Sequence, residues 1–108
     1  MPAYMIVIAK IADRDAFIHG YGAAAAKLVT QFGGTYVLRG PGAEVLEGQS
    51  GGMDWHGASI VISEWPDKAA AHVFWNSPEY AAVKKLRDGI ADCQVLLIEA
   101  PRINGATP

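Results

Sequence analysis

The feature that most constrains this chain is a set of strand-like segments that are apolar on both faces. In residues 4–11 both alternating sets of side chains are largely apolar, and residues 60–62 and 95–98 are continuous apolar runs. A strand with one solvent-exposed face alternates apolar and polar residues, so these runs indicate a sheet that is covered on both sides. Helices can cover one side, and 108 residues leave only a second copy for the other. The sequence therefore predicts a homodimer, with Val7 or Val61 as a position where a lysine would disrupt it if that residue faces the partner.

Length and charge limit the protein to a few classes. We expect one compact domain over residues 1–101 and a tail over residues 102–108 that frays or makes an exchangeable contact. The formal charge of −2, from 9 basic and 11 acidic residues, predicts no nucleic-acid partner and no membrane partner. The apolar runs are too short to span a bilayer, and the first residues do not read as a signal peptide. Cys93, the single cysteine, excludes an internal disulfide, so we expect a cytoplasmic location.

The first helix is predicted from its cap and its apolar spacing. Asp13 can cap a helix that ends at Gly33 and Gly34. Its apolar residues recur at steps of three and four, which is typical of an amphipathic helix. They are Phe17, Tyr21, Ala24, Leu28 and Phe32.

The remaining elements follow from β-branched residues, turns and caps. Strands are expected at residues 35–39, 58–65 and 92–101, with a short hairpin arm at 43–47 and a mobile loop at 48–57. Asp67 can cap a helix over residues 68–75, and Ser77 followed by Pro78 begins another. The order βαββαβ predicts a ferredoxin-like α+β fold: a four-stranded antiparallel sheet with helices on one face. The first and third strands then lie in the middle, and two sheets pair face to face in the dimer.

Several short motifs resemble the domain-of-unknown-function 1330 family within the dimeric α+β barrel superfamily. They are Leu38-Arg39-Gly40, Leu46-Glu47-Gly48, Ile62-Ser63-Glu64-Trp65-Pro66, Ala70-Ala71, Phe74-Trp75-Asn76-Ser77-Pro78-Glu79-Tyr80 and Arg87. The resemblance extends from Tyr4 to about Glu99. Trp65 and Asp67 depart from the usual family residues, and the loop at 53–56 is longer than is typical. The resemblance implies a homodimeric barrel and brings no established reaction, so it assigns no catalytic residue.

Arg87 is the first candidate for a ligand site. On a helical wheel that starts at Tyr80, Arg87 falls on the apolar face formed by Val83, Leu86 and Ile90. Its guanidinium could enter a cavity between helix and sheet and pair with an anionic ligand or with a carboxylate such as that of Glu64. The alternative, which the frequency of structural arginines somewhat favours, is that its stem packs while its head reaches solvent or loop carbonyls.

Other candidate ligand-binding residues each have a structural alternative. Tyr80 and Tyr21 lie on inner helix faces, where a buried phenol finds a hydrogen-bond partner. Asn76 and Ser77 lie between two helices, where capping is the simpler role. Arg39 closes a strand and is typical of an edge or interface charge.

Glu64 and His56 are the candidate proton carriers. An inward carboxylate at Glu64 would have a raised pKa suited to proton transfer; the alternative, of equal weight, is a solvated carboxylate at the strand end. His56 lies in a loop with Asp54, but the pair lacks the further ligands that zinc needs, and His19 and His72 lie off the apolar faces of their helices. We therefore expect no metal and no cofactor.

Two classes of function remain open. One is a small protein that binds a small metabolite, anionic or enolised, between helices and sheet, and the superfamily resemblance extends this to a cofactor-free isomerase or monooxygenase. The other is a non-catalytic dimeric structural or interaction module. Haem handling, which other branches of the superfamily perform, is an outlier that would need His72 or His56 as the axial ligand.

Overall fold

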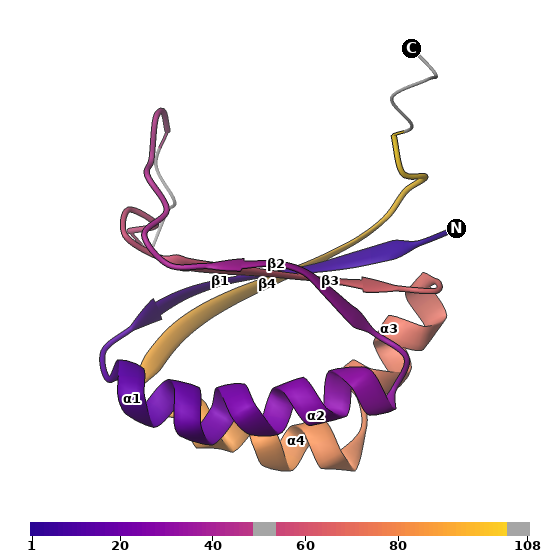
Figure 1. Ribbon diagram of the computed structural model, residues 1–108, viewed down its shortest axis with the longest axis horizontal. Coiled ribbons are helices and arrows are strands. Elements are labelled where there is room, and N and C mark those ends of the chain that lie inside the picture. Colours follow the sequence, from indigo (N-terminus) through magenta and orange to yellow (C-terminus); the bar gives the residue numbers. More distant parts are fainter. Residues whose placement is uncertain (49–53, 104–108) are drawn as a thin grey trace.

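The computed structural model of the chain describes residues 1–48 and 54–103. Its sheet contains β1 (Ala3–Ile11), β2 (Thr35–Gly40), β3 (Ser59–Trp65) and β4 (Ala91–Glu99), all antiparallel and in the order β2-β3-β1-β4. The helices cover one side of this sheet (Figure 1). The ferredoxin-like prediction is confirmed, and the two strands with apolar runs on both faces, β1 and β3, occupy the centre.

The side of the sheet that faces away from the helices is a continuous apolar surface. Directly opposite residues of an antiparallel sheet point the same way, and Ile6 is opposite both Ile62 and Leu96. We call this surface the open face; its apolar members are Ile6, Ile8, Leu38, Ile60, Ile62, Leu96 and Ile98. Leu38, Leu96 and Ile98 are 50%, 53% and 54% exposed. Ile8 is buried and Ile6, Ile60 and Ile62 are half-buried. The single chain thus leaves a part of this face, around Leu38, Leu96 and Ile98, without an apolar partner.

Val7 and Val61 lie on the other side of the sheet. They are opposite each other in the register, and both line a cavity between the sheet and the first helix. The prediction that a lysine at Val7 or Val61 would test a sheet-to-sheet dimer is therefore wrong. The two faces could not be told apart from the sequence because both are apolar. In the structure, Ile6 and Ile62 are the residues that belong to the face without helices.

The first helix is a continuous rod of α1 (Arg14–Ala16), a π-helical segment η1 (Phe17–Gly22) and α2 (Ala23–Gln31). The Asp13 side chain accepts a hydrogen bond from the Ala16 N–H at 3.1 Å, which confirms the predicted cap. In η1 the turn is wider, and the Ala23 N–H donates to the carbonyl oxygen of Ile18, five residues earlier. Gly22 suits this wide turn because a Cβ there would lie 3.3 Å from the carbonyl oxygen of Phe17.

The wide turn changes which side chains are buried. A π-helical turn holds more residues than an α-helical one, so positions four apart stay on the same side. The buried apolar residues are accordingly Phe17, Tyr21, Ala25 and Val29. Of the predicted apolar residues, Ala24 is only partly buried and Ala25 takes its place in the core, while Leu28 and Phe32 are half-buried against the core as expected.

The helices between β3 and β4 begin as predicted, but the last of them ends in a tighter turn than expected. The bounds of α3 (Lys68–Trp75) match the expectation, and the Asp67 side chain accepts from the Ala70 N–H at 2.8 Å. Pro78 and the Ser77 cap open α4 (Pro78–Lys84), which then tightens into the 3₁₀ segment η2 (Lys85–Arg87). Because the tighter turn rotates the following side chains, Leu86 is 49% exposed and not part of the buried face.

Residues 41–48, after β2, rise from the sheet on the side opposite the helices, as do residues 100–103 after β4 (Figure 1). The predicted arm at residues 43–47 contains no strand. It is tied to the sheet by the Ala43 N–H, which donates to the Ala58 carbonyl oxygen at 2.9 Å, and by the Gly57 N–H, which donates to the Ala43 carbonyl oxygen at 2.6 Å. The predicted mobile loop lies partly outside the described residues. No helix in residues 1–48 and 54–103 is long and apolar enough to cross a bilayer.

Candidate functional site

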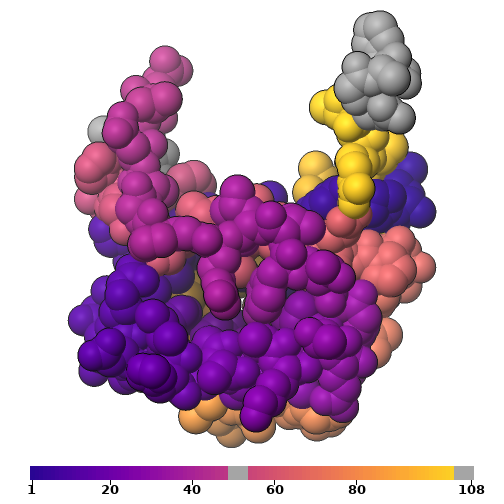
Figure 2. Space-filling model, viewed as in Figure 1, coloured from indigo at the N-terminus to yellow at the C-terminus, as the bar shows by residue number. Residues whose placement is uncertain are grey.

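A cavity of about 500 Å3 lies between the sheet and the first helix. Its sheet side is formed by the inward residues of β1 and β3, including Met5, Val7 and Val61, and its helix side includes Phe17 and Val29. Figure 2 shows the molecule hollowed at this place, between β2 and the helix that begins with α1. The walls are mainly apolar, which is typical of a site for a small organic molecule.

Arg14 and Arg39 both line this cavity, and we call the part of it that they line the mouth. Arg14, from the first turn of α1, donates from Nη2 to Oγ of Ser59 at 3.2 Å. Arg39 of β2 lies with its Cζ atom 5.9 Å from the ring centroid of Tyr36, and His19 also lines the cavity. Among the described lining residues none is an aspartate or a glutamate. The mouth therefore carries a net positive charge that favours an anion.

Two tyrosines from different helices meet further along the cavity, at a place that we call the inner end. The hydroxyl oxygens of Tyr21 and Tyr80 are 2.7 Å apart. Arg87 donates from Nη1 to the Tyr21 hydroxyl oxygen at 3.4 Å, and its Cζ atom lies 5.1 Å from the centroid of the Tyr21 ring. The 3₁₀ turn of η2 brings Arg87 to this position, behind Tyr21.

Burial governs the protonation of the inner end. Desolvation raises the pKa of both Tyr21 and Tyr80 above the ordinary value of a phenol, so both hydroxyls are neutral near pH 7. Burial likewise raises the pKa of the Cys93 thiol, against the opposing effect of Arg87. Groups of this kind donate hydrogen bonds and do not act as bases or thiolate nucleophiles at neutral pH.

The candidate ligand-binding residues divide into three groups. Tyr21, Tyr80 and Arg39 line the cavity, and Arg87 contacts it through Tyr21. Ser77 is the N-cap of α4: its hydroxyl donates to the Phe74 carbonyl oxygen at 2.8 Å and accepts from the Tyr80 N–H at 3.0 Å.

The third group is Asn76, which is the exposed C-cap of α3. Neither Asn76 nor Ser77 lines the cavity. The capping alternative therefore describes the side chain of Ser77, whereas Asn76 caps through its main-chain N–H, which donates to the His72 carbonyl oxygen at 2.9 Å.

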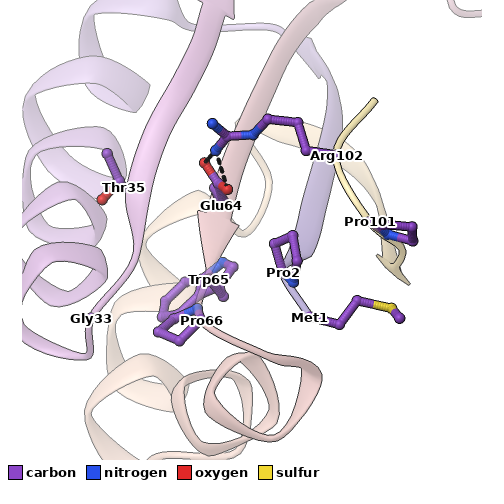
Figure 3. A pocket seen from close by; sticks show the side chains of 9 residues that line it. All are labelled: Met1, Pro2, Gly33, Thr35, Glu64, Trp65, Pro66, Pro101 and Arg102. Atoms are coloured by element: carbon purple, nitrogen blue, oxygen red, sulfur yellow. Dashed lines mark hydrogen bonds and ion pairs between the residues drawn. The ribbon is translucent and has the colours of Figure 1, made fainter. Parts of the chain in front are cut away.

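Glu64 lies on the side of the sheet away from the cavity. It is opposite Tyr4 in the register, accepts from the Tyr4 hydroxyl at 3.3 Å and forms an ion pair with Arg102. Figure 3 shows this pair in a shallow depression at the end of the sheet, beside Trp65 and Pro2. The considered pairing of Glu64 with Arg87 is not made; the carboxylate has Arg102 as its partner instead.

His56 lies in the segment that rises beyond the sheet. Its main-chain carbonyl oxygen accepts from Lys10 Nζ at 2.7 Å, and its Nδ1 accepts from the Val45 N–H at 3.4 Å. His56 and His72 are exposed, and neither lines the cavity. Within the described ranges no three histidine, cysteine, aspartate or glutamate side chains gather as a metal site would require.

Sequence reasoning missed five polar residues of the cavity: Arg14, His19, Tyr36, Ser59 and Ser63. Ser59 and Ser63 are buried on the inward face of β3, and Ser63 Oγ accepts from the Trp65 Nε1–H at 2.9 Å. A signal was present, since two serines separated by four residues interrupt one face of an otherwise apolar strand. The contact of Arg14 with Ser59 joins segments 45 residues apart and has no local sequence signal.

The fold and the cavity define a small ferredoxin-like α+β protein with an internal site of ligand size. Residues 2–101 match the family model of the domain of unknown function DUF1330, and the chain belongs to that family. No curated protein matches the sequence.

Solved structures share the fold at low sequence identity. A protein of unknown function from Rhodopseudomonas palustris is 19% identical, with a TM-score of 0.72 over 94% of this chain and 84% of that one. A dimeric ferredoxin-like protein of unknown function from Jannaschia sp. CCS1 is 16% identical, with a TM-score of 0.67 over 93% and 100% of the two chains. SnoaB, a cofactor-independent oxygenase from Streptomyces nogalater, is 13% identical, with a TM-score of 0.66 over 96% and 97%. At these identities the similarity shows the fold alone.

Proposed function

We propose that this protein is a homodimer that binds a small, anionic and largely apolar molecule in the cavity between the sheet and the first helix. The observation that carries the proposal is the pairing of apolar walls with a mouth that contains Arg14 and Arg39. The volume of about 500 Å3 lies within the usual range for ligand pockets. Arginine binds a carboxylate through two parallel hydrogen bonds, so a carboxylate at the mouth is the favoured anion.

The open face supports the dimer. Its exposed Leu38, Leu96 and Ile98 continue the apolar surface of the central strands, and large exposed apolar patches are typical of interaction sites. A second sheet packed on this face would remove the surface from water. Residues 41–48 and 100–103 rise on this same side, where they would flank such a partner (Figure 1). The related fold from Jannaschia sp. CCS1 is described as dimeric.

The ligand proposal can be tested with para-benzylbenzoate and its neutral amide, within a panel of aromatic and alicyclic carboxylates and their amides. We expect the carboxylates to bind more tightly than the amides, as measured by calorimetry. Arg39→Met should weaken carboxylate binding roughly tenfold and change amide binding little, because a charge-assisted hydrogen bond is lost. Lys27→Met, which removes an exposed cation of α2 away from the cavity, is the control. If no member of the panel binds, or if Arg39→Met and Lys27→Met behave alike, the proposal is wrong.

A cofactor-free enzyme is the second candidate. It is favoured by the neutral phenol pair beside the cavity and by the shared fold of SnoaB. Glu64 and His56 do not line this cavity, so as proton carriers they would have to act from outside it. His19 is an imidazole that does line the cavity. Enolisation can be followed by NMR with β-benzoylpropionate that carries deuterium on the carbon next to its ketone, as replacement of that deuterium by hydrogen from water. Exchange at the buffer rate would favour the non-catalytic module.

A further inference from the structure

We infer that the Tyr21–Tyr80 pair donates a hydrogen bond to a ligand oxygen, so that the ligand carries a carbonyl, enolate or phenolate oxygen at one end and an anionic group at the other. This inference rests on the proposed ligand site and specifies its chemical class. It concerns the inner end of the cavity, whereas the proposed function rests on the mouth.

A count of protons identifies the donor. Arg87 supplies an N–H to the Tyr21 hydroxyl oxygen, and one of the two phenol protons lies between the oxygens of Tyr21 and Tyr80. The other phenol proton has no acceptor among the described residues. Because donation by Arg87 polarises Tyr21 and makes it the better donor, the order runs from Arg87 through Tyr21 to Tyr80. The Tyr80 proton is then available to a group in the cavity, which Tyr80 lines.

Ser63 adds a second donor at the same end. Its Oγ accepts from the Trp65 indole, so its own proton is free to be donated. The Trp65 ring packs on Phe74 at a centroid distance of 4.9 Å, and Phe74 packs on Tyr80 at 4.6 Å, which joins Ser63 and Tyr80 through one aromatic cluster. Two neutral donors that face an apolar space suit an oxygen that accepts hydrogen bonds, and charge that develops on such an oxygen would be stabilised.

The two ends of the cavity are separated along the sheet. Ser59, which contacts Arg14, and Ser63 are four residues apart on β3, which corresponds to about 13 Å. Arg39 is opposite Val61, midway between them and about 7 Å from Ser63 along the strand. A ligand that reaches both ends therefore has an apolar body between its two oxygen groups, such as one or two rings.

A matched pair of probes isolates the inner end. The ketone para-benzoylbenzoate and the hydrocarbon para-benzylbenzoate share their rings and carboxylate and differ only in the bridging C=O or CH2. We expect the wild-type protein to bind the ketone about tenfold more tightly, and the carbonyl stretch of the bound ketone to shift to lower frequency. Tyr80→Phe should reduce both effects, and Tyr21→Phe combined with Tyr80→Phe should reduce them further, to what the Ser63 hydroxyl alone can support. Affinity for para-benzylbenzoate should stay within about twofold.

The outcomes separate the two proposals. If para-benzylbenzoate binds through Arg39 but the ketone has no advantage, or if its advantage and carbonyl shift are undiminished in the double variant, the inference at the inner end is overturned and the proposed function stands. If the double variant loses affinity for both probes equally, the phenols only maintain the cavity, and the inference is again overturned. If neither probe nor any other anion binds, both proposals fail. The single variant Tyr80→Phe keeps the test usable should the double variant fold poorly.

Discussion

The indole ring of Trp65 occupies the space that a side chain at position 34 would need. A Cβ atom built on Gly34 would lie 2.8 Å from two carbon atoms of that ring, closer than non-bonded carbons approach. Gly34 also donates its N–H to the Val29 carbonyl oxygen at 2.8 Å, which fixes it at the end of the first helix. Neither partner can move freely, because Trp65 is 1% exposed and its Nε1–H is held by Ser63.

Gly34→Ala should therefore lower the free energy of unfolding by about 1–3 kcal/mol, the usual cost of overpacking a core. Chemical denaturation measures the change. Gly20→Ala is the matched control, since a Cβ there has no atom within 4 Å and alanine suits a helix better than glycine. It should be neutral or stabilising. Equal losses in the two variants would contradict the packing argument.

Ile62→Lys should split the proposed dimer, because Ile62 lies at the centre of the open face opposite Ile6 and Leu38. A lysine there would have to be buried without a partner between two sheets. Sedimentation should show wild-type dimer at micromolar concentration, with an interface of at least about 1,200 Å2, and a monomeric or unfolded variant.

Val73→Lys is the control for this experiment. Val73 is 62% exposed on α3, on the helical side of the molecule, so the substitution should leave the dimer intact. A wild-type protein that is monomeric at micromolar concentration would refute the assembly, as would an Ile62→Lys variant that remains dimeric.

Arg87→Met and Glu64→Gln should change stability independently. Arg87 contacts Tyr21 beside the cavity, whereas Glu64 pairs with Arg102 and Tyr4 on the open face. We expect a modest loss for each variant and a double variant whose loss equals the sum within about 0.5 kcal/mol. Thermal melts of the three variants test this. A coupled loss of roughly 3–5 kcal/mol would mean that the two residues form a buried pair.

Stability should fall as the pH rises above about 10, where the tyrosines of an unfolded chain ionise. Burial raises the pKa of Tyr21 and Tyr80 in the folded state, so their stabilising contribution is complete below the unfolded pKa and is lost as pH rises toward the folded one. Denaturation at pH 8 to 11, with phenolate absorbance as a second readout, measures the effect. Tyr21→Phe should reduce the slope; an unchanged slope would show that Tyr21 ionises normally.

The arrangement of elements could be predicted because its signals are local. Alternating and continuous apolar runs marked the strands, and caps at Asp13, Asp67 and Ser77 placed three helix starts correctly. These signals depend on neighbours three or four residues away, so no tertiary contact is needed to read them. The preference of β1 and β3 for the centre of the sheet followed from their two apolar faces.

The contents of the cavity were decided by tertiary structure, as residue 39 illustrates. Regular alternation along β2 would place Tyr36 and Leu38 on one face and Arg39 on the other. The pairing is irregular between Tyr36 and Leu38, so that Leu38 joins Ile62 on the open face and Arg39 joins Val61 beside the cavity. A shift of one residue reverses the face of every later side chain, and only the pairing with β3 fixes that shift. The sequence by itself thus determined the order of the elements, while the register between strands decided which charges meet the ligand site.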